Sequence, residues 1–442
     1  MFPGTAMHVA LLADAHVSTG FLVIAYLAIA AAVIIMLSGL FAPGLRYKIS
    51  PVNSEDNTCN EFLHVLESLT DSKVQRALTL DVLTNGEEFY PEELRAIAAA
   101  QQSINLEAYI LQRGDIAQQY VDALTERARA GVRVRLVLDG LGSAGVTEKY
   151  FAKLEQAGGK VAWYNDAKWY KLPHYNNRSH REVLVVDGRL GFIGGPGVAD
   201  HWYKGKGRNP RWRDTMVKVE GPSVANLQAT FAENWLEASG EVLTGADSFP
   251  ALSAGTPENA ALVVNSTPSA GGSTRARILF QMLIASARES IHITTPYFLP
   301  DHAMMNELLK AIGERGVEVK LLVPGKRSDH LLTRSSSRFG YGKLLRADAA
   351  IFEYQPAMIH AKIMLIDRLW GVVGSTNFDN RSFGLNDEVN LAVRDANFVA
   401  RLESDFVKDL AQSERITYEK WRQRSLVARA PELLGWVLER QQ

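Results

Sequence analysis

The sequence has too few cysteines for a disulfide framework and too little net charge for a nucleic-acid-binding surface. Cys59 is the only cysteine among the 442 residues, so the chain forms no internal disulfide and offers no cysteine framework for a metal. Its 48 basic and 49 acidic residues give a formal net charge of −1, which provides no overall positive field for nucleic acid. We therefore expect no metal, cofactor or nucleic-acid partner. An anionic substrate would have to be held by a local cluster of donors.

Charged residues are also absent from a long segment near the N-terminus. The range 17–45 has no Asp, Glu, Lys or Arg and includes the run FLVIAYLAIAAAVIIML. About 20 apolar residues span a bilayer. Asp14 precedes the run and Arg46 and Lys48 follow it, whereas a cleaved signal peptide starts with basic residues and has a shorter apolar stretch. We expect a retained, single transmembrane helix at 17–42 in the cell inner membrane, and the positive-inside bias puts the rest of the chain in the cytoplasm.

The rest of the chain contains one succession of patterns twice. The ranges 102–140 and 290–324 each read as a strand, a helix and a strand, with alternating apolar residues in the strands. HREVLVVDGRLGFIGG, which begins at His180, is similar to HAKIMLIDRLWGVVGS, which begins at His360. So long a period indicates that a whole domain was duplicated. Each half is expected to form an α/β sandwich.

Composition predicts the domain boundaries. The range 241–272 is rich in Ser, Pro, Gly, Ala and Thr and is expected to link a first half at 75–240 to a second half at 273–442. The C-terminal range 406–438 has spaced apolar and basic residues, which predict amphipathic helix packed on the body of the protein.

A histidine, a lysine and an aspartate occur at regular spacing in the second half. His360 and Lys362 are two residues apart at the start of an apolar strand that ends at Asp367, so their side chains should share a face. The GSTN turn that follows adds the hydroxyl of Ser375 and the amide of Asn377. An imidazole, an ammonium group and an amide would therefore project together.

These residues resemble the HxKxxxxD motif and the following GS/GGxN turn of the phospholipase D superfamily. Over about 81–421 the chain is similar to bacterial cardiolipin synthases, notably in GSTNFDNRSFGLNDE at 374–388 and WRDTMVKVEGP at 212–222. The resemblance implies two pseudo-symmetric phospholipase D-type α/β sandwich halves around one central cleft, preceded by the N-terminal transmembrane helix.

The resemblance also implies a reaction without metal or cofactor. One motif histidine attacks phosphorus to form a phosphohistidine, and the other protonates the departing alcohol and then deprotonates the incoming one. Asp214 is expected to orient His360, and Glu388 to orient His180, each across the interface between the halves. The expected roles are catalytic for His180, His360, Lys362, Asp214 and Glu388, phosphate-binding for Lys362, Asn377, Ser375 and Glu182, and structural for the motif aspartates Asp187 and Asp367.

The first half departs from the motif at two positions. Glu182 stands where the motif has lysine, and Gly197 where the turn has asparagine. Three interpretations stay open. Glu182 pairs with Arg178 or Lys206, which then contacts the phosphate; or it favours the protonated form of His180 as a general acid; or this half-site has lost its function.

The expected function is phosphatidyl transfer at the bilayer, with a phosphatidylglycerol-like phospholipid as substrate, cardiolipin as product and His180 as the nucleophile. One alternative is hydrolysis of a phospholipid or, less in keeping with the near-neutral charge, of a nucleic-acid phosphodiester. Another is a lipid-binding pseudoenzyme, because Glu182 and Gly197 replace the usual donors.

Overall fold

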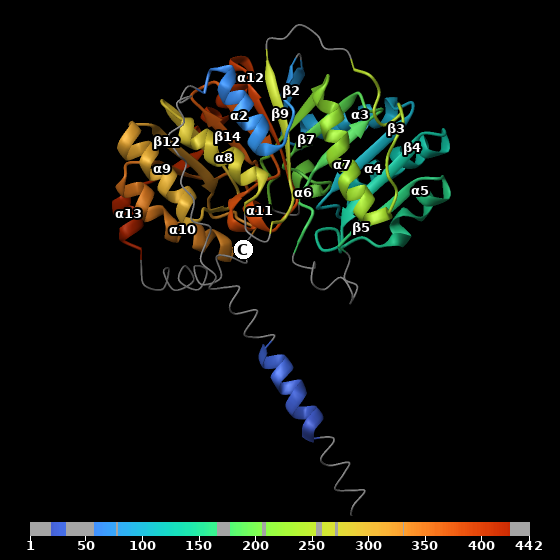
Figure 1. Ribbon diagram of the computed structural model, residues 1–442, viewed down its shortest axis with the longest axis horizontal. Helices are drawn as coiled ribbons and strands as arrows, with labels where there is room; N and C mark the ends of the chain where they lie inside the picture. Colours follow the sequence, from blue (N-terminus) through green and yellow to red (C-terminus); the bar gives the residue numbers. More distant parts are fainter. Residues whose placement is uncertain are drawn as a thin grey trace, which may run out of the picture. The chain divides into compact units, whose positions relative to one another are not determined.

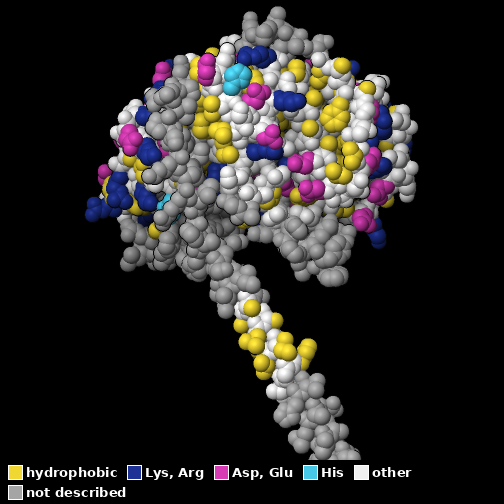
Figure 2. Space-filling model, in the orientation of Figure 1, with side chains coloured by type: hydrophobic (Ala, Val, Ile, Leu, Met, Phe, Trp, Pro, Cys, Tyr) yellow, Lys and Arg dark blue, Asp and Glu magenta, His cyan; other side chains and the backbone are white. Residues whose placement is uncertain are grey.

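The N-terminal segment and the remainder of the chain are separate structural units. The computed structural model describes residues 19–31, 57–76, 78–165, 177–205, 209–252, 259–269, 273–329 and 331–424. Residues 19–31 form a helix with exposed apolar side chains, among them Phe21 and Ile24 (Figure 2). None of the described helices is long and apolar enough to cross a bilayer. The other residues of the anchor predicted at 17–42, which are 17–18 and 32–42, lie outside the described residues.

Seven strands of the first half form one mixed sheet (Figure 1). They are β2 (Thr79–Thr84), β3 (Ser103–Ala108), β4 (Arg133–Asp139), β5 (Lys160–Tyr164), β6 (Val183–Val186), β7 (Leu190–Gly194) and β8 (Thr215–Glu220). Their order in the sheet is β2-β8-β7-β6-β3-β4-β5. β3, β4 and β5 are parallel, and the other neighbours are antiparallel.

The second half repeats this topology. Its strands are β9 (Ala260–Ser266), β10 (Ser290–Thr294), β12 (Glu318–Pro324), β13 (Ala350–Tyr354), β14 (Ile363–Ile366), β15 (Trp370–Gly374) and β17 (Glu388–Arg394), with β1 (Gln75–Arg76) and β18 (Ser413–Ile416) at the edges. Between those edges the order is β9-β17-β15-β14-β10-β12-β13, which matches the first sheet strand for strand. The predicted duplication into two sheet-containing α/β halves is therefore confirmed.

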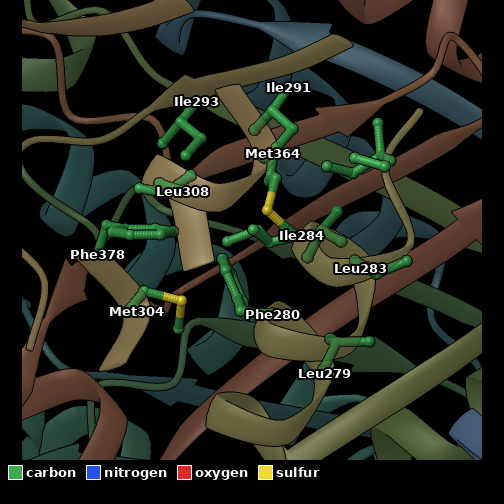
Figure 3. Close-up of a cluster of buried hydrophobic side chains, with 14 of the residues drawn as sticks. Leu279, Phe280, Leu283, Ile284, Ile291, Ile293, Met304, Leu308, Met364 and Phe378 are labelled. Atoms are coloured by element: carbon green, nitrogen blue, oxygen red, sulfur yellow. The ribbon is translucent and has the colours of Figure 1, made fainter. Parts of the chain in front are cut away.

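Helices pack against each sheet and enclose a buried apolar cluster in each half, and a further cluster joins the two halves. The longer helices are α2 (Asn60–Thr70), α3 (Gly86–Ala99), α4 (Asp115–Arg129), α7 (Ser223–Ser239), α8 (Arg275–Ser286), α9 (His302–Arg315), α10 (Leu331–Arg346) and α12 (Ala396–Ala411). One buried cluster lies between α3, α4 and the first sheet. Another lies between α2, α8, α9 and the second sheet, where Figure 3 shows Met364 directed towards Ile284. A third contains Val185 and Val217 of the first half with Leu365 and Leu391 of the second.

Short elements complete the connections near the strand ends. They are η1 (Glu148–Phe151), α5 (Ala152–Gln156), α6 (Asp200–Tyr203), β11 (Phe298–Leu299), β16 (Phe378–Asp379), α11 (Asn380–Gly384) and α13 (Tyr418–Arg422).

Three segments differ from what the sequence patterns predict. The expected linker 241–272 contains β9. The composition of the whole range is rich in Ser, Pro and Gly, and it concealed the apolar run AALVVNS that forms this strand. β1, expected in the first half, pairs with β9 in the second sheet, and α2 packs beside α8 (Figure 1). The helix predicted at 406–438 is interrupted, because the residues after α12 pair with β13 as β18 before α13 begins. Residues 425–438 lie outside the described residues.

Candidate active site

His180 is held by residues of the opposite half. Its backbone N–H donates to the Asp387 carbonyl oxygen at 2.9 Å, and its ring Nδ1 lies 3.1 Å from both carboxylate oxygens of Glu388. Glu388 is fully buried and also accepts a hydrogen bond from the hydroxyl of Ser375. Burial alone would raise the pKa of Glu388, but the charge and hydrogen bond of His180 and the bond from Ser375 outweigh it and lower that pKa. Glu388 is therefore an ionised acceptor that orients the His180 ring.

His360 is held in the same way by residues of the first half. Its backbone N–H donates to the Arg213 carbonyl oxygen at 2.7 Å, and its Nδ1 lies 2.8 Å from Oδ2 of Asp214. The indole N–H of Trp202 donates to the same oxygen at 3.0 Å, and the Thr215 N–H donates to Oδ1 at 2.8 Å. Burial opposes ionisation of Asp214, but the hydrogen bond and charge of His360 and the charge of Lys362 lower its pKa overall.

Each histidine is held by a carboxylate of the opposite half, so the two contacts cross the same interface in opposite directions. In each, a short backbone bridge joins the residue before the histidine to the residue before the carboxylate, Ser179 to Asp387 and Ile359 to Arg213. The structure thus brings together both histidine–carboxylate pairs that the family resemblance implies. Because every pair takes one member from each half, neither half alone contains an oriented histidine.

Lys362 gives the second half a cation beside its histidine. The Lys362 ammonium lies 2.8 and 2.9 Å from the two ring nitrogens of His360, and the lysine is 4% exposed. Burial lowers the pKa of Lys362, although the carboxylates of Asp214 and Glu388 act in the opposite direction. Burial and the Lys362 charge also lower the pKa of His360. At neutral pH the ring is therefore uncharged, with its Nδ1–H donated to Asp214 and an electron pair on Nε2.

Ser375 and Asn377, the other predicted phosphate ligands, have different surroundings. The Ser375 hydroxyl donates to Glu388 and accepts the Val389 N–H at 3.0 Å, so it is committed to holding that carboxylate. Asn377 is 5% exposed, and its Oδ1 has no hydrogen-bond partner among the described residues. Of the two, Asn377 is the side chain with a polar atom left for a ligand.

The motif aspartates lie at the far ends of the strands that follow the histidines. Asp187 accepts the backbone N–H groups of Gln101, Gln102 and Ser103 at 2.7 to 3.2 Å. Asp367 accepts those of Arg288, Glu289 and Ser290 at 2.7 to 3.1 Å. These contacts fix a strand connection, as expected for structural residues.

Glu182 points its carboxyl group at the backbone. Oε1 accepts the N–H groups of Tyr109 at 3.2 Å and Ile110 at 3.3 Å. The guanidinium of Arg178, one of its two predicted partners, bonds to Asp139 at 3.3 Å and to backbone carbonyls; the other, Lys206, lies outside the described residues. These contacts do not favour the interpretation in which Arg178 bridges Glu182 and a phosphate.

Aromatic residues surround both histidines. Trp202 is fully buried against Asp214, the Trp212 ring centroid is 5.5 Å from that of His360, and the Tyr109 centroid is 5.1 Å from that of His180. No spacing rule links Trp202 to a carboxylate twelve positions later, so only the tertiary structure identifies it. In the described part of the chain, no group of three or more His, Cys, Asp and Glu side chains could hold a metal ion.

Comparisons with known proteins agree with this architecture. A family model described as cardiolipin synthase, PLD-like domain, matches residues 94–235 and 280–410, one segment in each half. Cardiolipin synthase 1 of Bacillus cereus is 34% identical over 360 residues, which cover 79% of this chain and 70% of that protein. Cardiolipin synthase A of Pseudomonas aeruginosa is 35% identical over 342 residues, covering 76% and 68%. The crystal structure of phosphatidylserine synthase from Haemophilus influenzae shares the fold, with a TM-score of 0.62 at 13% identity over 86% of this chain and 96% of that one. The chain belongs to the cardiolipin synthase family of phospholipase D-like proteins.

Proposed function

We propose that the chain transfers a phosphatidyl group from one phospholipid to the hydroxyl of another through a phosphohistidine, as expected of a cardiolipin synthase. The observation that carries the proposal is the pair of buried histidines, each bonded through Nδ1 to an ionised carboxylate of the opposite half. That bond orients each ring and leaves its Nε2 for chemistry at phosphorus.

The two histidines have complementary tasks. Nε2 of one attacks phosphorus while the bond to the departing alcohol oxygen breaks, and the other histidine gives that oxygen a proton. In the second step an incoming hydroxyl loses its proton to the second histidine and displaces the first. Lys362 and Asn377 would stabilise the charge that develops on the phosphoryl oxygens, where one donor is worth roughly 3–4 kcal/mol.

The surroundings of His360 favour it as the nucleophile, in place of His180. A nucleophilic imidazole must be unprotonated, and burial together with the Lys362 charge keeps His360 in that form. The same ammonium group lies where it would meet the phosphoryl oxygens of a group bonded to His360 Nε2. Rapid quenching followed by peptide mapping would identify the phosphorylated histidine, and label on His180 would reverse the assignment.

A membrane phospholipid such as phosphatidylglycerol is the substrate that fits this activity, and a membrane anchor at 17–42 would hold the site beside it. Apolar side chains exposed along residues 19–31, such as Phe21 at 70% and Tyr26 at 71%, support burial of this helix in lipid. We propose one crossing of the inner membrane with the catalytic part in the cytoplasm. Resistance to alkaline extraction, together with protease access in inverted vesicles only, tests this topology.

The activity is tested with the full chain in liposomes that contain acyl-labelled phosphatidylglycerol. Labelled cardiolipin should form, and His360→Ala and His180→Ala should abolish it. His64→Ala is the matched control, because that histidine is 77% exposed on α2. Phosphatidic acid as the sole product would instead indicate a hydrolase. Absence of turnover in the unmodified chain would favour a lipid-binding protein.

A further inference from the structure

The two positions at which the first half departs from the motif are neighbours in space. Glu182 corresponds to Lys362, and Gly197 to Asn377, in the two matching sheets. A Cβ atom at Gly197 would collide with the Ile110 carbonyl oxygen and would lie 2.9 Å from Oε1 of Glu182. An asparagine at this position therefore conflicts with the observed place of the carboxyl group. The two departures are therefore coupled: the Glu182 carboxyl group takes the place of a cation, and a residue without a side chain makes room for it.

Backbone donors that the second half lacks hold this carboxyl group. The strand register shows which residues of the two halves correspond. Ile104 pairs with Val186 in the first sheet, and Ile291 pairs with Ile366 in the second. Five positions after these isoleucines, the first half has Tyr109 and the second half has Pro296. Proline has no N–H, so the second half cannot offer the same pair of donors. Both donors in the first half bond to Oε1 of Glu182, and no backbone N–H of the described residues bonds to Oε2.

Burial of Glu182 favours the uncharged form of its carboxyl group. It is 6% exposed, and burial raises its pKa well above the ordinary value, although the two N–H bonds and the Lys362 charge oppose that rise. The other titratable groups around it are the Glu93 carboxyl, whose own pKa is raised to about 8, and the hydroxyls of Tyr90, Tyr109 and Tyr120. A neutral carboxyl both donates and accepts hydrogen bonds, which suits an alcohol hydroxyl better than a phosphate.

Tyr109 contacts both Glu182 and His180. The Tyr109 N–H bonds to Glu182, while the Tyr109 ring centroid is 5.1 Å from that of His180. The Lys362 cation belongs to the half that contains His360. The site is therefore polarised, with a cation on one side and a buried carboxyl group on the other.

We propose that the carboxyl group of Glu182 binds the hydroxyl of the acceptor alcohol and makes this residue a determinant of acceptor specificity. The inference rests on the proposed phosphatidyl transfer. In the transfer step the P–O bond to the acceptor forms as the P–N bond to His360 breaks, and the hydroxyl proton passes to Nε2 of His180. Glu182 only binds the hydroxyl and takes no part in the bond changes or the proton transfer.

The test measures how one intermediate divides between alcohol and water. The full chain in liposomes is given acyl-labelled phosphatidylglycerol and increasing deuterated glycerol, and the ratio of mass-shifted phosphatidylglycerol to phosphatidic acid is recorded. Because both products arise from the same phosphohistidine, the ratio reports on the acceptor and not on the donor. Glu182→Ala should lower the ratio about ten-fold through a higher KM for glycerol, as expected for one lost hydrogen bond. Glu182→Gln, which still donates and accepts, should stay within about three-fold of the unmodified ratio.

Two further variants separate this role from folding. Glu93→Gln changes a neighbouring buried carboxyl that bonds to Tyr120, and it should leave the ratio unchanged. Glu182→Lys should lower the ratio while hydrolysis continues. If Glu182→Ala reduced the total rate but left the ratio and the glycerol KM unchanged, the inference about Glu182 would be overturned and the proposed function would stand. If the unmodified chain formed no glycerol or lipid transfer product, the proposed function would fail as well.

Discussion

Replacement of Asp214 by asparagine tests whether this carboxylate acts on His360. In the structure the two oxygens of Asp214 serve three donors, His360 Nδ1, the indole of Trp202 and the Thr215 N–H. Asparagine has one acceptor oxygen for these three donors. Either Thr215 loses its acceptor, or the new NH2 group faces Nδ1 of His360. The second outcome forces the tautomer that carries its hydrogen on Nε2, which cannot attack phosphorus.

The expected loss follows from the 2.8 Å contact between Asp214 and His360. The ring becomes cationic during the reaction, and a unit charge pair at this distance is worth about 6 kcal/mol at an effective dielectric constant of about 20. An amide hydrogen bond recovers roughly 1 kcal/mol. We expect kcat to fall between about 100-fold and 10,000-fold, that is by about 3–5 kcal/mol.

The assay is single-turnover transfer from labelled phosphatidylglycerol, measured across pH. Since the hydrogen bond and charge of Asp214 raise the pKa of His360, the acid limb of the rate profile should move to lower pH in the variant. Asp187→Asn is the control, because the same change at a strand end should lower the melting temperature and leave kcat unchanged. A folded Asp214→Asn variant with kcat within ten-fold of the unmodified chain and an unmoved acid limb would refute the reasoning.

Three more predictions concern charge and stability. Burial lowers the pKa of Lys362 from 10.5, so kcat/KM should begin to decline with rising pH below pH 10.5. If the residual activity of Lys362→Arg declined at the same pH as that of the unmodified chain, the decline would belong to another group. Arg213→Ala leaves Asp409 buried without its ion pair and should reduce the free energy of unfolding by roughly 3–5 kcal/mol. Arg401→Ala is the control: this arginine is 39% exposed, and its loss should cost about 1 kcal/mol or less. Equal losses for the two variants in denaturant titrations would contradict the prediction. Burial raises the pKa of Glu93 to about 8, so between its unfolded pKa and that value the folded state binds more protons and stability falls as pH rises. Glu93→Gln should remove this fall in melting temperatures taken at about pH 5 and pH 8, and a persistent fall would assign it elsewhere.

Sequence patterns predict the repeated parts of the molecule well because they are local. The second-half motif lies in one short segment, so the neighbouring positions of His360 and Lys362 follow from strand geometry alone. The surroundings of Glu182 could not be predicted in this way, because they depend on a strand register that places a proline in one half where the other has Tyr109. β9 was missed because its apolar residues lie inside a segment with the average composition of a linker.

The crossed histidine–carboxylate pairs have a consequence for the history of the chain. A single ancestral half would have had a histidine without its acceptor, and two identical copies related by a two-fold axis would have supplied both acceptors at once. In such a homodimer, every substitution appears on both sides of the site. Within one chain the two motif positions can differ, and here they hold Lys362 in one half and Glu182 in the other.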